Sequence, residues 1–231
     1  MGACFDAAII DLDGTLVDTM GDFVAALNLM LGDLGPSPAG TLAVDAATVT
    51  PMVGKGSEHL IRSVLNHLQA QELPARPAID LIASYDTAFA RYQHHYHAVS
   101  GRYSTLYPGA LEGVRALRSA GLKLACVTNK PLAFARPLLQ AKGLDGFFRE
   151  VFGGDSFARK KPDPLPLLKA CEALGTRPAR TLMIGDSSND AAAARAAGCP
   201  VVLVTYGYNH GQPVRAVDAD GFVDSLANLL A

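Results

Sequence analysis

Two aspartates, one residue apart, follow a short apolar run near the start of the chain. The run Ala7-Ala8-Ile9-Ile10 leads directly into Asp11-Leu12-Asp13-Gly14-Thr15. A short apolar run that ends in acidic residues and a glycine is typical of a buried strand that stops at a turn. Two carboxylates at such a position cost too much free energy to bury unpaired. We therefore expect Asp11 and Asp13 to hold a cation, to attack an electrophile, or to do both.

Two later segments have the same form, an apolar run followed by polar side chains. The run Leu124-Ala125-Cys126-Val127 precedes Thr128-Asn129-Lys130. The run Leu182-Met183-Ile184-Gly185 precedes Asp186, with Asp190 four residues further on. In open parallel sheets, ligands bind beyond the carboxyl ends of the strands. We therefore expect the three polar clusters to converge at one edge of a sheet, although they are far apart in the sequence.

A fourth segment would complete a site for phosphoryl transfer. Lys160-Lys161-Pro162-Asp163-Pro164 supplies cationic side chains on a stiff loop. A phosphate monoester is close to a dianion at neutral pH, so an attacking carboxylate needs its charge offset. Oxygen-bound Mg²⁺ and a lysine can provide this. One aspartate then attacks phosphorus to give an aspartyl-phosphate that water hydrolyses, and a second acid protonates the leaving alkoxide.

Taken in order, these segments resemble the four motifs of the haloacid dehalogenase superfamily of phosphohydrolases, and the resemblance covers nearly the whole chain. It implies that Asp11 is the nucleophile and a magnesium ligand. It also implies that Asp13 is the acid–base residue and that its backbone carbonyl binds the metal. The other implied roles are phosphate-oxygen donors at Thr128 and Asn129, a charge-offsetting lysine at Lys161, an acidic metal ligand at Asp186 and a supporting acid behind the ligands at Asp190.

The apolar patterns divide the chain into two parts. Residues 5–11 and about 122–231 alternate short apolar strands with amphipathic helices, which predicts a Rossmann-like parallel sheet flanked by helices. Residues 17 to about 100 show helical periodicity and no strand pattern. We therefore expect an α/β fold with a core domain at 1–16 and 101–231 and an inserted all-helical cap domain at 17–100, which by resemblance closes over the site and carries selectivity.

The positions of the elements follow from the same patterns. Strands are expected at 122–128, 148–152, 181–184 and 201–204, and helices at 132–142, 165–174 and 189–197. Asp163 is expected to cap the helix at 165–174, and Ser57 to cap a helix in the insertion. Three apolar helix faces are expected in the insertion: Phe23, Ala26, Leu27, Met30 and Leu31; Leu60, Ile61, Val64, Leu65 and Leu68; and Ile82, Tyr85, Phe89, Tyr92 and Tyr96.

The insertion contains one glycine-flanked lysine, in the segment Val53-Gly54-Lys55-Gly56-Ser57. Lys55 is the one lysine between residues 17 and 105. Backbone N–H groups and the dipole at the start of a helix favour an anion there. We expect Lys55 and Ser57 to contact the part of the substrate beyond the phosphate, such as a second anionic group. A flexible turn with a solvated lysine is the alternative.

A finer resemblance is to phosphoglycolate phosphatases. The stretches that carry it are Val53-Gly54-x-Gly56, Leu106-Tyr107-Pro108-Gly109, Val127-Thr128-Asn129-Lys130-Pro131, Gly153-Gly154-Asp155-Ser156 and Tyr206-Gly207-Tyr208-Asn209. It implies Mg²⁺-dependent hydrolysis of 2-phosphoglycolate, a small metabolite with a phosphate and a carboxylate. The chain departs from this pattern at Lys55, where asparagine or a similar polar residue is expected.

Other functions stay open on the sequence. A phosphonate hydrolase would use Lys55 as a Schiff-base nucleophile. A sugar-phosphate mutase, another small-metabolite phosphatase and a phosphate-binding regulatory protein without activity are further alternatives. A dehalogenase is not favoured, because Asp13 supplies the proton that an ester leaving group needs.

Composition narrows the classes of partner. The 231 residues are 49% apolar and carry a formal charge of −2, from 20 basic and 22 acidic residues, so no nucleic-acid or membrane partner is expected. Neither a signal peptide nor a membrane span is expected, which favours a cytoplasmic protein.

Lys160 is expected to face solvent. Reduced thiols without a metal site are expected at Cys4, Cys126, Cys171 and Cys199. A partly exposed helix surface, and not a metal site, is expected at His94, His95 and His97. The sequence predicts no oligomeric state.

Overall fold

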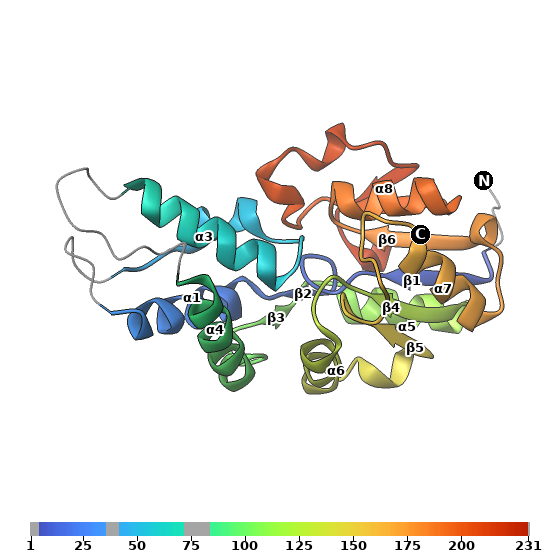
Figure 1. Ribbon diagram of the computed structural model, residues 1–231. Helices are drawn as coiled ribbons and strands as arrows, with labels where there is room; N and C mark the ends of the chain where they lie inside the picture. Colours follow the sequence, from blue (N-terminus) through green and yellow to red (C-terminus); the bar gives the residue numbers. More distant parts are fainter. Residues whose placement is uncertain (1–4, 36–41, 72–83, 231) are drawn as a thin grey trace.

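A six-stranded parallel sheet forms the centre of the computed structural model, which describes residues 5–35, 42–71 and 84–230 (Figure 1). Its strand order is β5-β4-β1-β6-β7-β8. The strands are β1 (Ala7–Ile10), β4 (Lys123–Val127), β5 (Glu150–Phe152), β6 (Thr181–Gly185), β7 (Val201–Val204) and β8 (Gly221–Val223). Because β1 pairs with β4 on one side and β6 on the other, the segments that follow these three strands are neighbours.

Helices cover both faces of this sheet, as the sequence predicts. They are α5 (Ala110–Ser119), α6 (Leu132–Ala141), α7 (Leu165–Leu174) and α8 (Ser188–Ala197). Side chains alternate across β1: Ala8 and Ile10 pack with residues of α5 and α6, whereas Ala7 and Ile9 pack with residues of α7 and α8. All four residues of β1 are fully buried, as expected for a parallel strand covered on both faces.

The second group of helices lies to one side of the sheet (Figure 1). It contains α1 (Met20–Asp33), α2 (Ala46–Val49), α3 (Ser57–Gln71) and α4 (Tyr85–Val99). The expected faces of α1 and α3 are buried in one cluster, together with Tyr92 and Tyr96 of α4. Tyr85 and Phe89 are partly buried against that cluster, and Ile82 lies outside the described residues. Tyr208, from the segment after β7, also packs into it.

A two-stranded antiparallel ribbon joins the helical group to the sheet. It pairs β2 (Val17–Asp18) with β3 (Thr105–Leu106). The prediction that residues 17–100 contain no strand is therefore wrong at its first two residues. A two-residue strand is too short to show alternation in the sequence. The three-residue edge strand β8 was not predicted for the same reason.

The described residues also contain six short 3₁₀ helices: η1 (Thr50–Met52), η2 (Asp145–Phe147), η3 (Pro178–Arg180), η4 (Asn209–Gly211), η5 (Val214–Ala216) and η6 (Leu226–Asn228). Asp163 Oδ1 accepts a hydrogen bond of 2.9 Å from Leu165 N, the first N–H of α7, although the residue directly before the helix is Pro164 and not the predicted Asp163. Ser57 is the first residue of α3 and not the residue before it.

No helix in the described part of the chain has the length and apolar character needed to cross a bilayer. Cys126, Cys171 and Cys199 are buried free thiols, and Cys4 lies outside the described residues.

Candidate active site

Asp11 extends β1 by one residue and points its carboxylate into a buried ion pair. Its N–H donates to Ile184 O of β6 at 2.9 Å, which continues the strand pairing. Lys161 Nζ lies 2.9 Å from Asp11 Oδ1. Burial raises the pKa of Asp11 to about 7, although the charge of Lys161 opposes the increase. Asp11 Oδ1 is buried and accepts no hydrogen bond of good geometry, so its contact with Lys161 is an ion pair alone.

Lys161 connects three elements of the core. Its ammonium donates to Val127 O at the end of β4 (2.8 Å) and to Asp190 Oδ1 of α8 (2.7 Å), in addition to pairing with Asp11. Burial alone would lower the pKa of Lys161, but the two carboxylates outweigh it and raise the pKa. The lysine therefore stays charged in a buried position.

Asp190 is saturated by hydrogen bonds from its own turn. Its Oδ2 accepts from Asp186 N (3.2 Å) and from the N–H and hydroxyl of Ser187 (3.1 and 2.8 Å), which forms the capping box of α8. A Cβ at Gly185 would lie 2.3 Å from Asp190 Cγ, so only glycine leaves room for this carboxylate. Asp190 thus orients Lys161 and the loop after β6.

Asp186 lies at the end of β6, beside Asp11. Its Oδ2 accepts from Tyr208 N at 2.7 Å and its Oδ1 from the Thr15 hydroxyl at 3.3 Å. Burial, followed by the charges of Asp190 and Asp11, raises the pKa of Asp186 well above its usual range. A Cβ at Gly207 would lie 2.2 Å from Asp186 Cβ, so the backbone after β7 packs directly against this side chain.

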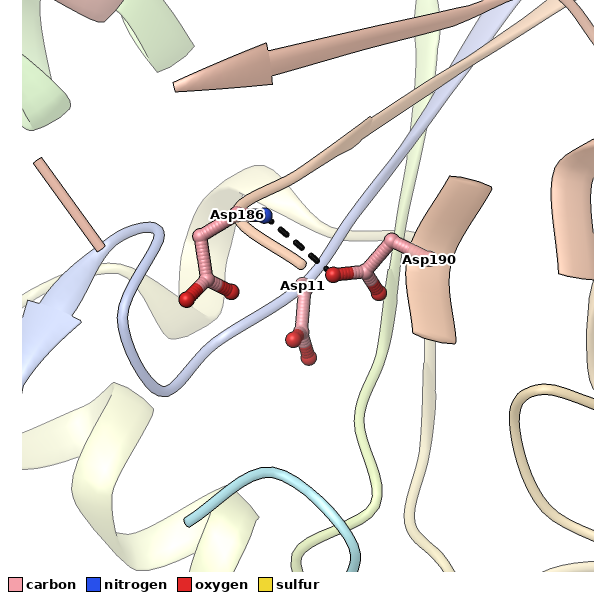
Figure 2. A group of neighbouring side chains, drawn as sticks. All are labelled: Asp11, Asp186 and Asp190. Carbon is pink, nitrogen blue, oxygen red and sulfur yellow. Dashed lines mark hydrogen bonds between the residues drawn. The ribbon is translucent and has the colours of Figure 1, made fainter. Parts of the chain in front are cut away.

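The three carboxylates lie side by side, although Asp11 comes from a segment far from that of Asp186 and Asp190 in the sequence (Figure 2). One oxygen of each of Asp11, Asp186 and Asp190 lies within 4.8 Å of the others. Oxygen ligands of this kind, one of them without a hydrogen-bond partner, suit a hard divalent cation such as Mg²⁺. The histidines of α4 are not part of a comparable cluster in the described residues, and His95 instead lies 2.7 Å from Asp33 on the helix surface.

The residues after β4 lie at the same edge of the sheet. Thr128 is buried, and its hydroxyl oxygen accepts from Lys130 N at 3.2 Å, which leaves the hydroxyl hydrogen available to donate. Asn129 Nδ2 donates to Lys161 O (2.8 Å) and to Gly54 O (3.0 Å). The amide of Asn129 therefore has no hydrogen left for a phosphate oxygen in this conformation, and its backbone N–H would have to serve that role.

A pocket lies between this edge of the sheet and the helical group. Asp11, Thr128 and Asp186 line one side, and we call the strand-end residues Asp11, Thr128, Lys161, Asp186 and Asp190 the strand-end site. The opposite side is formed by Phe23, Tyr92 and Tyr96, which we call the aromatic wall. Tyr96 stacks with Phe23 and Tyr92 at centroid distances of 5.7 and 5.4 Å. The sequence predicts that these rings lie in the core of the helical group. They do, and they also line the pocket.

Asp13 faces the pocket in contact with Lys130, a residue for which the sequence predicted no role. Lys130 Nζ lies 3.0 Å from Asp13 Oδ1 and 3.1 Å from Oδ2. The same ammonium lies 4.8 Å from the ring centroids of Phe23 and Tyr96. Lys130 directly follows Thr128 and Asn129 in the sequence. Its position just after a strand end is the feature from which its place in the site could have been predicted.

The loop at residues 53–57 borders the pocket, as predicted, but its lysine does not. Gly54, Gly56 and Ser57 line the pocket, whereas Lys55 is exposed and is not among the lining residues. Hydrogen bonds hold the loop against the sheet domain. Gly54 O accepts from Asn129 and from Asn189 Nδ2 (3.1 Å), and His210 Nδ1 lies 2.7 Å from Val53 O.

Lys160 keeps 36% of its side chain exposed, in line with the expectation that it faces solvent, and it also contacts the helical group. Its ammonium lies 3.7 Å from Glu58 of α3. A Cβ at Gly56 would lie 2.8 Å from Lys160 Nζ. This contact between α3 and residue 160 joins distant parts of the chain, so the residues around either position do not predict it.

Comparisons with known proteins agree with this geometry. The family model of haloacid dehalogenase-like hydrolases matches residues 5–198. A phosphoglycolate phosphatase of Thiobacillus denitrificans is 45% identical over 222 residues, which cover 96% of this chain and 92% of the relative. A plasmid-encoded phosphoglycolate phosphatase of Cupriavidus necator is 46% identical over 225 residues, or 97% and 91% of the two chains. The crystal structure of a predicted phosphoglycolate phosphatase from Haemophilus somnus has a TM-score of 0.87 and 32% identity, and the match covers 98% of this chain and 96% of that one.

Proposed function

Because the chain belongs to the haloacid dehalogenase-like hydrolases, we propose that it is a Mg²⁺-dependent phosphatase whose substrate is 2-phosphoglycolate. The observation that carries the proposal is the strand-end site, where Asp11 pairs with Lys161 beside Asp186 at the ends of adjacent strands. A nucleophilic carboxylate, a buried cation and an acidic metal ligand are the groups that phosphoryl transfer from a monoester requires.

In the first half of the reaction, a carboxylate oxygen of Asp11 attacks phosphorus. A bond forms between Asp11 and phosphorus, the bond from phosphorus to the ester oxygen breaks, and Asp13 gives that oxygen its proton. Lys161 offsets the negative charge of the phosphate and of Asp11. The hydroxyl of Thr128 and the backbone N–H of Asn129 donate to the phosphate oxygens.

In the second half, water attacks the phosphorus of the aspartyl-phosphate. Asp13, now a carboxylate, takes a proton from this water while the bond to Asp11 breaks. Phosphate leaves, and Asp11 and Asp13 return to their starting states. Asp190 acts indirectly, because it holds the ammonium of Lys161.

The residues at the strand ends fit a magnesium ion. The carboxylates of Asp11 and Asp186 and the backbone carbonyl of Asp13 would hold it, as the family resemblance implies. When bound, Mg²⁺ supplies positive charge that neutralises the carboxylates and the phosphate oxygens. Asp11 Oδ1, buried without a hydrogen bond, supports this assignment.

We further propose that residues 17–100 act as the cap domain and that residues 1–16 and 101–231 form the core domain. The separate apolar cluster of α1, α3 and α4 supports this division, as does the ribbon of β2 and β3 that joins the two parts. Closure of the cap over the strand-end site would exclude water from the reaction.

Phosphoglycolate as substrate rests on the relatives and on the small pocket bordered by the aromatic wall. The alternative of a phosphonate hydrolase needs a lysine amine inside the pocket to form a Schiff base. Lys55, the lysine that the sequence suggested for this role, is exposed and outside the lining, so the geometry does not support a Schiff base at Lys55.

A screen of phosphate esters with the purified protein tests the proposal. We expect Mg²⁺-dependent phosphate release, abolished by chelation, with kcat/KM for phosphoglycolate about a hundredfold above that for sugar phosphates, or about 2.7 kcal/mol of transition-state discrimination. Equal rates across the panel would contradict the substrate, and release that does not depend on a divalent cation would contradict the mechanism.

A further inference from the structure

Lys130 is the one lysine or arginine among the described residues that line the pocket, and no step above uses it. Its side chain is only 3% exposed. Burying an ammonium costs free energy unless anions or aromatic faces replace its water. A buried cation that faces a substrate pocket is therefore a candidate for binding an anionic group of the substrate.

The backbone of Lys130 is fixed, so the ammonium has a defined position. Lys130 N donates to the Thr128 hydroxyl oxygen at 3.2 Å, and Lys130 O accepts from Gly154 N at 2.8 Å. A Cβ at Gly154 would lie 2.3 Å from Asn129 O, so the backbones of the two loops are in direct contact. This packing sets Lys130 at the end of β4, beside the phosphate-binding residues.

The ammonium is enclosed but is not saturated by oxygen acceptors. A lysine has three N–H donors. In the described part of the chain, the oxygens in contact with Lys130 Nζ are the two of Asp13, at 3.0 and 3.1 Å. Phe23 and Tyr96 contribute ring faces at 4.8 Å. One N–H is therefore left for an acceptor that enters the pocket.

We propose that Lys130 is the residue that recognises the carboxylate of the substrate, an inference that rests on the proposed function. In a phosphorylated 2-hydroxy acid, the carboxylate carbon is two bonds from the ester oxygen that Asp13 protonates. Because Lys130 Nζ is 3.0 Å from Asp13, a substrate whose ester oxygen contacts Asp13 brings its carboxylate within reach of the ammonium. The aromatic wall keeps water away and so strengthens this ion pair.

Lys130 thus takes the place for which the sequence suggested Lys55. Lys55 belongs to the loop at residues 53–57 and Lys130 to the segment after β4, and of the two only Lys130 lines the pocket. A carboxylate bound by Lys130 would also lie under Phe23 and Tyr96, which come from α1 and α4. Selectivity for the carboxylate would then come from Lys130, which follows β4 of the sheet and is held in place by the rings of Phe23 and Tyr96 from the helical group.

The test compares two esters that differ only in the second anionic group, phosphoglycolate and 2-hydroxyethyl phosphate. We would measure kcat/KM for both with the wild-type protein, Lys130→Met, Lys130→Gln and Lys55→Met, with Lys169→Met on the exposed face of α7 as the control. Lys130→Met should slow both reactions, because Asp13 loses a contact. The preference for phosphoglycolate should fall by about 10- to 100-fold, the worth of a hydrogen bond between charged groups.

The ratio of the two kcat/KM values separates recognition from a structural role. If Lys130 only supports Asp13, both esters lose activity equally, and the proposal is wrong while the phosphatase assignment stands. A fall in the ratio for Lys55→Met and not for Lys130→Met also overturns the proposal. Lys130→Gln, which keeps a polar side chain, gives the same readout if Lys130→Met does not fold.

The wild-type protein tests the proposed function separately. Equal kcat/KM values for the two esters would overturn both the phosphoglycolate assignment and the role of Lys130, but not the phosphatase activity. Hydrolysis of neither ester would overturn the proposed function itself.

Discussion

The two sides of the pocket are built from different interactions. In the strand-end site, Asp11 and Asp190 share the buried ammonium of Lys161, so each charge depends on its partners. The aromatic wall contains no ionised group, and its rings pack against one another and against the helical core. The strand-end site is therefore suited to chemistry that moves charge, and the aromatic wall to selection by shape and by exclusion of water. Lys130 lies between the two, because its backbone N–H donates to Thr128 of the strand-end site and its ammonium contacts the rings of Phe23 and Tyr96.

The largest effect should come from the nucleophile. Asp11→Asn keeps the size of the side chain but removes the attacking carboxylate, so we expect kcat to fall by about 10⁴-fold. Phosphate release under saturating Mg²⁺ measures this, and circular dichroism verifies the fold. Asp163→Asn, which preserves the cap of α7 outside the pocket, is the control and should remain active. Turnover of Asp11→Asn close to the wild-type rate would exclude the aspartyl-phosphate mechanism.

Removing the shared cation should affect stability as well as activity. Lys161→Met leaves the carboxylates of Asp11 and Asp190 buried without a cation, so we expect a loss of about 3–5 kcal/mol in the free energy of unfolding at pH 8. Urea denaturation measures this loss, and the exposed pair of Lys169 and Glu172 provides the control variant Lys169→Met. The loss should be smaller at pH 5.5, where Asp11 can take up a proton. An unchanged free energy of unfolding in Lys161→Met would mean that the ion pairs of Lys161 do not stabilise the strand-end site.

The pKa of Asp11 predicts how the metal-free protein responds to pH. This pKa is raised to about 7 in the folded state, above its usual value, so the folded protein binds the proton more tightly than the unfolded chain. The stabilisation is present in acid and is lost as the pH rises through about 7. We expect the Tm without metal to fall between pH 5.5 and 8, and the increase in Tm on adding Mg²⁺ to be larger at pH 8. A Mg²⁺ effect independent of pH would contradict the assignment of Asp11 as a ligand.

A smaller effect is expected when the metal ligand is displaced without being removed. A Cβ at Gly207 would collide with Asp186, so Gly207→Ala should shift that carboxylate and weaken Mg²⁺ affinity by about 10- to 100-fold. Titration of activity with Mg²⁺ should show a higher requirement and recovery at high concentration. Gly32→Ala, where a Cβ meets no atom within 4 Å, is the matched control. An unchanged Mg²⁺ requirement in Gly207→Ala would argue against Asp186 as a ligand.

The smallest effect should come from the contacts between the loop at 53–57 and the sheet domain. Asn189→Ala removes one of the two amide donors to Gly54 O. Because such a hydrogen bond contributes about 1 kcal/mol, we expect KM to increase about fivefold. Steady-state kinetics measure this, with Asn228→Ala on the surface as the control. If kcat falls instead with KM unchanged, Asn189 acts on the reaction itself and not on the position of the loop.

Much of the fold follows from local sequence. The first and last residues of β7 and α7 were predicted correctly. An apolar run of four residues marks β7, and an amphipathic pattern that begins after Asp163-Pro164 marks α7. The ribbon of β2 and β3 was missed, since two residues cannot show a pattern. The buried faces of α1 and α3 were predicted from their period alone.

The contacts across the pocket were harder to predict. Lys55 was selected because it lies between two glycines, yet its side chain is exposed. Lys160 is partly exposed as expected, but its contact with Glu58 of α3 was not predicted. Lys130 and Asp13 are 117 residues apart in the sequence, and nothing local to either residue indicates their contact.

By itself, the sequence determined which strands are buried and which polar residues end them, because burial and turn formation depend on neighbouring residues. It thereby determined that acidic, hydroxyl and amide side chains lie at the ends of three strands. The tertiary structure decided which of these side chains meet, because that depends on the strand order β4-β1-β6 and on the packing of α1 and α4 over the sheet edge. It also decided which lysine faces the pocket, since the direction of a side chain is set by contacts with residues far away in the chain.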